Sequence, residues 1–261
     1  MSLTRAASTP LDDVTAVGAV RLTGVSKRFT NDGPPVLEDI DLQIAPGEFV
    51  CLLGASGCGK STLLSILAGL EPATAGGVDV GDEGAALMFQ EPALFPWLSA
   101  RANVELALRL RGVPTSERRR RAGELLELVR LAEAGDKRVH ELSGGMRQRV
   151  ALARSLAQER PVLLMDEPFA ALDAITRDLL HDELERIWRE TGRTIVFVTH
   201  NVREAVRLGQ RVLLMSSRPG RIVREWRVDE AGERRIGAPE AAALADRITD
   251  DLRTEIRRHA G

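Results

Sequence analysis

The side chains best placed for chemistry lie in one eight-residue segment, Gly54-Ala55-Ser56-Gly57-Cys58-Gly59-Lys60-Ser61. It matches the phosphate-binding pattern G-x-x-x-x-G-K-[S/T] at every fixed position. A short buried strand is predicted before it at residues 49–53, and a helix that starts at Thr62 is predicted after it. A glycine-rich turn between a strand and a helix points backbone N–H groups and the positive end of the helix dipole at one place. The segment therefore predicts a nucleotide site, in which Lys60 reaches the β- and γ-phosphates and the Ser61 hydroxyl holds Mg²⁺.

Two carboxylates, Asp166 and Glu167, follow the apolar run at residues 162–165. A strand that is buried on both faces can expose charge only at its ends, so these side chains should emerge at its C-terminal end. We expect Asp166 to hold Mg²⁺ through water, and Glu167 to polarise a water for attack on the γ-phosphate. Alone, the pair could equally be ordinary acidic residues at a strand end. Together with the phosphate-binding loop, it predicts phosphoryl-transfer chemistry.

A second anion-binding loop is predicted at Leu142-Ser143-Gly144-Gly145, where a serine and two glycines open a helix. This loop has no lysine, so the chain carries one complete and one incomplete phosphate cradle. Its sequence resembles the signature of ATP-binding-cassette (ABC) ATPases. The other landmarks of that family are found in order over residues 19 to 227, at Gln90, Asp166-Glu167, Ala171-Leu172-Asp173 and His200.

The resemblance implies roles for individual residues. His200 would contact the γ-phosphate and support Glu167, and Gln90 would sense Mg²⁺ and the attacking water. Phe29 would stack on adenine, with packing in the core as the alternative, and Asp173 would contact a partner cassette. The implied catalytic set is Glu167, His200, Gln90 and Lys60, and the implied Mg²⁺ set is Ser61, Gln90 and Asp166. The implied ATP-binding set is Phe29, Gly54, Ala55, Ser56, Gly57, Cys58, Gly59, Lys60, Ser61, Thr62, Ser143, Gly144, Gly145 and Asp173.

Partners are also implied by the resemblance. In ABC ATPases two cassettes face each other head to tail, and the ATP on one phosphate loop is capped by the signature of the other. The second cassette could be another copy of this chain or a different cassette. The pair would act on an integral membrane permease from the cytoplasmic face of the cell membrane, as peripheral subunits. A periplasmic or extracellular substrate-binding protein would be met only indirectly.

Three local segments are similar to the ATPases of nitrate, alkanesulfonate and taurine importers. They are residues 95–98, 166–177 and 218–222. Ala170 and Asn201 depart from that pattern, which frequently has glycine and aspartate at these places. Within the first segment, Phe95 and Trp97 either receive a short helix of a permease or pack inside the protein.

The fold predicted by this pattern is α/β. Strands alternate with helices from residue 162 onward, which favours a mostly parallel sheet. The resemblance implies a P-loop NTPase cassette with a RecA-like core, an N-terminal antiparallel β subdomain and a helical subdomain inserted at about residues 95–160. We expect a disordered tail at residues 1–18, the cassette at 19–228 and a helical extension at 229–261. In the extension, Leu244, Ile248, Leu252 and Ile256 recur every four residues, which predicts a docking helix.

Composition limits the classes of function. With 36 Lys and Arg against 38 Asp and Glu, the net charge is −2, and no nucleic acid partner is expected. A soluble ABC ATPase that acts on nucleic acid or ribosomes is the alternative, but neither a second cassette nor a zinc module is seen in this sequence. A small-molecule kinase is disfavoured by the Leu142–Gly145 signature. The position of Cys58 beside Lys60 and a helix N-terminus predicts a lowered thiol pKa.

Overall fold

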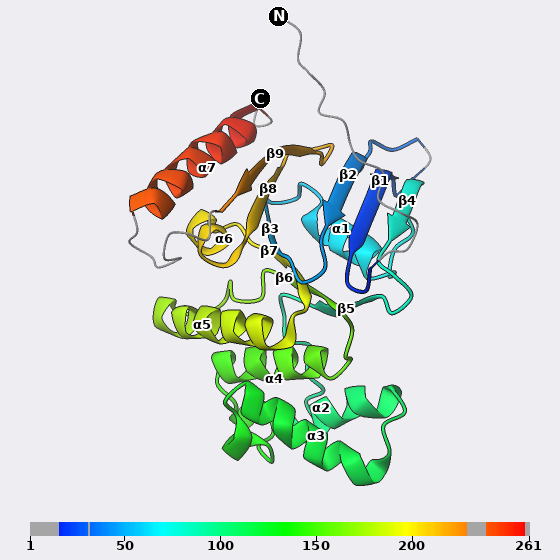
Figure 1. Cartoon of the computed structure of the whole chain (residues 1–261), viewed down its shortest axis with the longest axis vertical. Coiled ribbons are helices and arrows are strands. Elements are labelled where there is room, and N and C mark those ends of the chain that lie inside the picture. The colour runs from blue at the N-terminus through cyan, green and yellow to red at the C-terminus, as the bar shows by residue number, and fades with distance from the viewer. Residues whose placement is uncertain (1–15, 31, 229–238, 259–261) are drawn as a thin grey trace, which may run out of the picture.

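The computed structural model describes residues 16–30, 32–228 and 239–258 (Figure 1). The expected disordered tail lies outside the described residues up to position 15, as do residues 229–238 and 259–261 of the predicted extension. The described chain contains a central sheet, a smaller sheet beside it, and helices on both sides of the central sheet.

The central sheet has six strands in the order β5-β6-β7-β3-β8-β9. All neighbours pair in parallel except β9, which runs antiparallel to β8 at one edge. Side chains alternate between its two faces, so the apolar runs predicted from the sequence fill two separate hydrophobic cores. The strands are β3 (Phe49–Gly54), β5 (Ala85–Met88), β6 (Val162–Asp166), β7 (Thr194–Val198), β8 (Arg211–Met215) and β9 (Ile222–Arg227).

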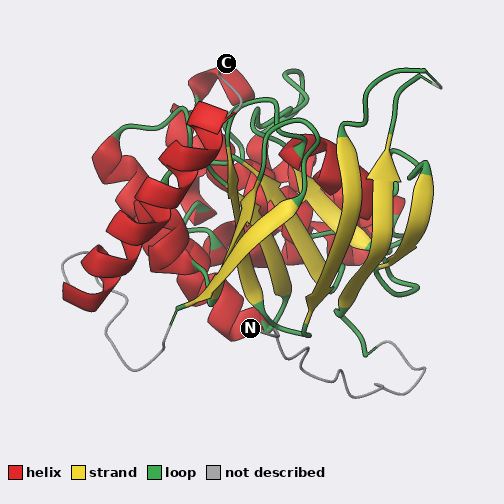
Figure 2. Cartoon of the chain, turned by 90° about the horizontal axis from the view of Figure 1, so that it is seen from above, coloured by secondary structure: helices red, strands yellow, loops and turns green. Residues whose placement is uncertain are grey.

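A three-stranded antiparallel sheet and helix α1 (Lys60–Leu67) cover one face of the central sheet. The order of this small sheet is β2-β1-β4, and Figure 2 shows its strands beside the larger sheet. Along its strands, buried residues that face the core alternate with residues that face solvent. In β2, every apolar residue of Leu-Glu-Asp-Ile-Asp-Leu-Gln-Ile is buried. Its strands are β1 (Val20–Lys27), β2 (Leu37–Ile44) and β4 (Ala75–Asp79).

The remaining helices belong to the hydrophobic core on the other face of the central sheet. Three of them form a helical block, in which α2 and α4 begin at serine caps: Ser99 accepts from the Ala102 N–H at 3.1 Å, and Ser143 from the Met146 N–H at 3.2 Å. Both caps satisfy N–H groups that the first turn of a helix leaves without partners. The block consists of α2 (Ala100–Leu110), α3 (Thr115–Leu128), the short 3₁₀ turns at Ala132–Ala134 and Val139–Glu141, and α4 (Gly144–Leu156). The fold is thus α/β, with an antiparallel β subdomain and a helical subdomain around a parallel core.

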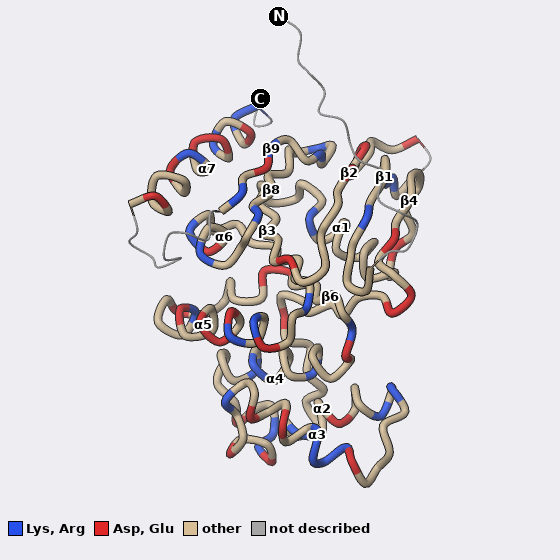
Figure 3. The backbone as a smooth tube through the Cα atoms, in the orientation of Figure 1, with Lys and Arg blue, Asp and Glu red and all other residues tan. Residues whose placement is uncertain are grey.

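Helix α7 (Pro239–Arg258) packs on α6 (Val202–Leu208). It buries Leu244 and Ile248 and partly buries Leu252, but Ile256 is 44% exposed. Because four residues rotate a helix by about 40° more than a full turn, a four-residue spacing drifts away from the contact face. Charged residues of both signs occur along α7 and along α5 (Ala174–Thr191), as Figure 3 shows. Among the described helices, none is both long and apolar enough to cross a membrane.

This packing predicts unequal effects of two substitutions on one helix. Ile248→Ala removes a fully buried side chain and leaves a cavity, so it should destabilise the protein by about 2–4 kcal/mol. Ile256→Ala is the matched control and should cost less than about 1 kcal/mol. The midpoints of urea unfolding, followed by circular dichroism, measure both. Equal midpoints for the two variants would show that α7 is not docked as described.

Candidate nucleotide site

The phosphate-binding segment leads from the end of β3 into the first turn of α1, as its pattern requires. At two glycines of this segment, neighbouring atoms leave no room for a side chain. A Cβ on Gly54 would lie 2.7 Å from the Cys58 Sγ, and a Cβ on Gly59 would lie 2.7 Å from a Leu37 methyl carbon. Gly59 also has φ 102°, a left-handed conformation that side chains rarely adopt. The loop therefore depends on glycine at both ends.

Lys60 supplies the positive charge inside this loop. Its side chain is buried, and its Nζ donates hydrogen bonds to the carbonyl oxygens of Gly54 at 2.8 Å and Ala55 at 3.0 Å. These hydrogen bonds hold the ammonium group against the backbone of the loop, near the N-terminus of α1. An anion that approaches the α1 N-terminus meets the ammonium and the backbone N–H groups together.

Cys58 lies in the same loop and has a thiol of low acidity. Burial raises the pKa of Cys58, although the nearby Lys60 charge opposes the shift. The predicted lowering of this pKa is therefore wrong. The sequence displays the lysine and the helix N-terminus, but it does not display the desolvation, which is the larger effect.

Asp166 ends β6 beside the phosphate loop. The Ser61 hydroxyl at the start of α1 lies close enough to this carboxylate to oppose a rise in its pKa. Burial raises the pKa of Asp166, and the Glu167 charge adds to the rise, whereas the Ser61 hydroxyl and the Lys60 charge oppose it. A hydroxyl and a half-buried carboxylate side by side are oxygen ligands of the kind that Mg²⁺ prefers. The donor set therefore fits the predicted ion, whose positive charge would favour the ionised form of Asp166.

Glu167 and His200 form a pair at the ends of neighbouring strands. The Glu167 Oε2 lies 3.0 Å from the His200 Nδ1. The Glu167 backbone has φ 43°, a rare conformation for this residue type, and its N–H donates to the Val198 carbonyl at 3.0 Å. The glutamate side chain is mostly shielded, whereas the imidazole is 64% exposed. The carboxylate is thus fixed by its backbone and oriented by the imidazole.

Gln90 is exposed just after β5, and its backbone is tied to helix α4. The buried Gln148 donates from its Nε2 to the Gln90 carbonyl oxygen at 3.0 Å. The Gln148 Oε1 is buried and has no hydrogen-bond partner among the residues that the structure describes. This contact joins the segment after β5 directly to the helix that the signature opens.

The signature residues lie at the N-terminus of α4, with Ser143 exposed. Gly145 is packed so closely against α5 that a Cβ would lie 2.7 Å from the Thr176 methyl carbon. Asp173 caps α5 by accepting from the Thr176 N–H at 2.9 Å, and this hydrogen bond lowers the Asp173 pKa. Ser143 and Asp173 each accept a hydrogen bond from the first turn of the helix that they cap. Both residues are exposed, so their polar side chains also face solvent.

Phe29 lies at the surface. Its side chain is 61% exposed, with the Lys27 Nζ 5.0 Å from the ring centroid. The alternative that Phe29 packs in the core is therefore wrong.

Phe95 and Trp97 lie together where the helical block begins. Their ring centroids are 5.5 Å apart, and the Trp97 side chain is 66% exposed. The fully buried Asn103 holds this segment, since its Oδ1 accepts from the Phe95 N–H at 2.8 Å and its Nδ2 donates to the Phe95 carbonyl at 3.3 Å. Arg138 donates to the Trp97 carbonyl. The aromatic pair is held by polar clamps that no sequence motif announces, although a buried asparagine on an apolar helix face is a possible signal.

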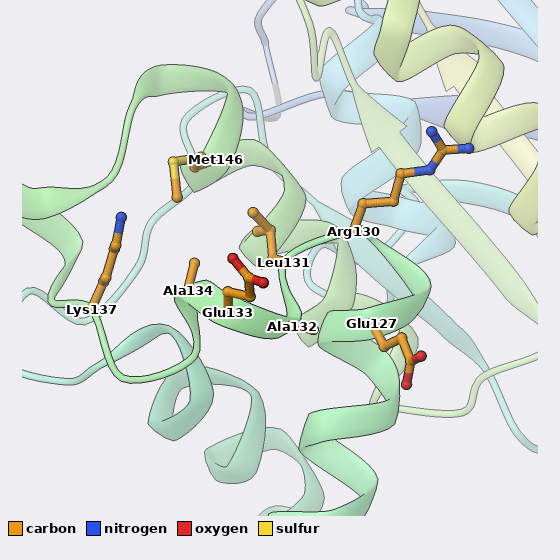
Figure 4. A pocket seen from close by; sticks show the side chains of 8 residues that line it. All are labelled: Glu127, Arg130, Leu131, Ala132, Glu133, Ala134, Lys137 and Met146. Atoms are coloured by element: carbon orange, nitrogen blue, oxygen red, sulfur yellow. The ribbon is translucent and has the colours of Figure 1, made fainter.

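A pocket of about 580 Å³ lies in the helical block, between the end of α3 and the start of α4 (Figure 4). Arg130 at its edge is paired with the buried Glu183 of α5 at 2.8 Å, and in Figure 4 its guanidinium points away from Lys137 and Met146. None of the described residues in the predicted ATP site lines it. The lining residues are Glu127, Arg130, Leu131, Ala132, Glu133, Ala134, Lys137 and Met146.

A glycine-rich strand-to-helix loop, with carboxylates at the end of a parallel strand of the same sheet, defines the class of P-loop nucleotide hydrolases. The model of the ABC transporter family matches residues 37–170 of the chain. The chain belongs to this family of ATPases. Its sequence is 42% identical to the taurine import ATP-binding protein TauB of Chromobacterium violaceum, over 94% of this chain and 99% of the relative.

Other known proteins agree with this placement. The taurine import ATP-binding protein TauB of Burkholderia thailandensis is 48% identical over 78% of this chain and 81% of its own length. Among solved structures, a dimeric post-hydrolysis state of the ATP-binding cassette MJ0796 with ADP and Pi matches with a TM-score of 0.70. It is 34% identical, over 80% of this chain and 99% of that chain.

The burial of Cys58 predicts slow thiol chemistry. Because its pKa is raised, less thiolate is present at pH 8 than in a free cysteine, and alkylation should accelerate only at higher pH. We expect iodoacetamide to modify Cys58 at least about tenfold more slowly in the folded protein than in urea. Mass spectrometry of the peptide measures both rates. Alkylation of folded protein as fast as in urea would contradict the burial.

Proposed function

We propose that the chain is the ATP-hydrolysing subunit of an ABC importer. The observation that carries the proposal is the Glu167–His200 pair at 3.0 Å, next to the strand end where Asp166 meets Ser61. These groups lie at the C-terminal ends of adjacent parallel strands, with the phosphate loop on the next strand. Phosphoryl transfer needs a phosphate cradle, an ion site and a positioned water within one such edge.

In this proposal Lys60 and the N–H groups of the loop bind the β- and γ-phosphates. Glu167 polarises the attacking water, and His200 orients the Glu167 carboxylate and contacts the γ-phosphate. Phe29 offers its exposed ring to the adenine. Hydrolysis yields ADP and phosphate.

Ser61 and Asp166 would hold Mg²⁺, with Gln90 near it. A bound Mg²⁺ would neutralise charge on the β- and γ-phosphate oxygens. Because Gln90 is tied through Gln148 to α4, the ion site is physically connected to the signature helix of the same chain.

A second cassette would complete the site, with a second copy of this chain as the simplest partner. Ser143, Gly144 and Gly145 form a helix N-terminus, which favours an anion. Ser143 and Asp173 are exposed, as contacts to another subunit require. The dimeric state of the similar cassette MJ0796 supports this arrangement.

Mixing two inactive variants tests the shared site. Lys60→Ala damages the phosphate loop, and Ser143→Arg damages the signature. A mixed dimer has one site with both defects and one intact site, so a 1:1 mixture should recover about a quarter of the wild-type ATPase rate, because half of random dimers are mixed. Phosphate release measures the rate.

The matched control combines Lys60→Ala with Glu167→Gln. Both variants damage the half of the site that holds the phosphate loop, so no mixed dimer has an intact site. Recovery in this control, or none in the first mixture, would contradict a site built from two chains.

The importer proposal rests on the relatives, which are named taurine import ATP-binding proteins. The Phe95–Trp97 aromatic pair is the surface we propose for a helix of the membrane permease, because it is exposed and held in place. The chain would then lie at the cytoplasmic face of the membrane as a peripheral subunit. A periplasmic or extracellular substrate-binding protein would contact the permease. No observation favours action on nucleic acid or ribosomes.

Taurine or a similar sulfonate is the proposed cargo class. In proteoliposomes that contain the cognate permease and binding protein, external taurine should stimulate ATP hydrolysis by this chain, and nitrate should not. The Glu167→Gln subunit provides the background rate. Stimulation by nitrate without a response to taurine would overturn the cargo assignment but leave the ATPase intact.

A further inference from the structure

We infer that His181 and Glu204 are positioning residues for ATP hydrolysis, which hold the Thr199–Asn201 loop and thereby His200. This inference rests on the proposed function of the Glu167–His200 pair. His181 lies on α5, and Glu204 lies in the first turn of α6. Both side chains are buried.

The hydrogen bonds form one continuous chain that ends beside His200. The Asn201 N–H donates to the Thr199 Oγ1 at 2.9 Å, and the Thr199 hydroxyl donates to the Glu204 Oε2. The other carboxylate oxygen, Glu204 Oε1, lies 2.5 Å from the His181 Nε2. The Arg207 Nη1 lies 3.3 Å from the His181 Nδ1 and closes the chain.

The direction of these hydrogen bonds assigns the state of the imidazole. A guanidinium has no acceptor, so Arg207 donates and the His181 Nδ1 accepts. The Nε2 then carries the proton and donates to Glu204. Arg207 is itself paired with Asp178 at 2.9 Å and Asp182 at 2.7 Å, both on α5. Asp178 Oδ1 also lies 3.7 Å from the His181 Nδ1, which makes it the other charge that faces the ring.

This hydrogen-bond network matters because the His200 side chain is itself held by little packing. Its side chain is 64% exposed, so its position depends on the loop backbone rather than on neighbours. That backbone is fixed from three sides: the Thr199 N–H donates to the Leu52 carbonyl at 3.2 Å, the Thr199 hydroxyl contacts Glu204, and the Asn201 side chain caps α6. Loss of the hydroxyl contact would free the loop to rotate His200 away from Glu167.

A stability role alone does not account for this network. Apolar side chains of similar size commonly stabilise a core as well as a buried polar group does. The ring of His181 already packs against Phe169, with ring centroids 5.6 Å apart, and Phe169 packs on Phe197 of β7 at 5.9 Å. An apolar residue at position 181 would still fill the space beside Phe169, but it would leave the buried Glu204 Oε1 without its donor. The polar groups therefore act on the geometry of the loop.

Paired variants test this inference in the full chain. His181→Leu removes the donor to Glu204 and should lower kcat about tenfold, with the KM for ATP within about twofold of wild type, because substrate binding is untouched. His181→Gln keeps an N–H donor and an acceptor and should stay within about threefold of the wild-type kcat. Thr199→Val and Thr199→Ser form a second pair, and the serine variant should retain most of the kcat that the valine variant loses. Glu183→Gln, another buried site on α5, is the control for a general effect on the helix.

The outcomes distinguish the proposed ATPase function from the positioning role of His181 and Glu204. Wild-type hydrolysis and its loss in Glu167→Gln report on the proposed function, whatever the His181 variants do. A fall in kcat in the leucine and valine variants, reversed in glutamine and serine, supports the positioning role. Wild-type kcat in His181→Leu overturns it. A parallel loss of kcat and thermal stability in all four variants, or an equal loss in Glu183→Gln, also overturns it.

Discussion

The order of three parallel strands, β6-β7-β3, is the constraint on which the candidate site depends. Each strand is almost wholly buried, so polar and charged groups can emerge only at the ends. The three C-terminal ends deliver the phosphate loop, Asp166 with Glu167, and His200 to one edge. The helices then supply dipoles and caps at that edge, and the two cores on either side of the sheet keep the strands in register.

Local patterns in the sequence predicted the strands that lead to this edge, the phosphate loop and the signature helix, since each depends on a contiguous run of residues. Glu167 was predicted from its position after a buried strand, and His200 from the resemblance to ABC ATPases. Their contact follows from the pairing of β6 with β7. The role of each of these residues stays a prediction. A run of residues does not show how far each side chain is exposed to solvent. The Cys58 pKa moves opposite to expectation because burial outweighs Lys60, and Phe29 is at the surface where core packing had been the alternative.

Contacts between distant segments were beyond the sequence for a related reason. His181 and Glu204 are 23 positions apart, and neither belongs to a recognisable motif. They meet only because α5 and α6 share the core on one face of the central sheet. The same holds for Asn103, which clamps the Phe95 segment, and for the antiparallel edge strand β9, whose half-exposed pattern gave no strong alternation.

Gln148 links the segment after β5 to helix α4 mechanically. It ties the Gln90 backbone to α4 by one hydrogen bond, and within the described part of the chain its carboxamide oxygen has no partner that would add a second. Helix α4 behaves as a stiff rod over this length, so Ser143 lies roughly 7.5 Å farther along its axis. A rigid-body shift of α4 would therefore move Ser143 and the group that holds the Gln90 backbone together. In the proposed dimer, Gln148 would therefore connect the ion site of one nucleotide to the signature that caps the other.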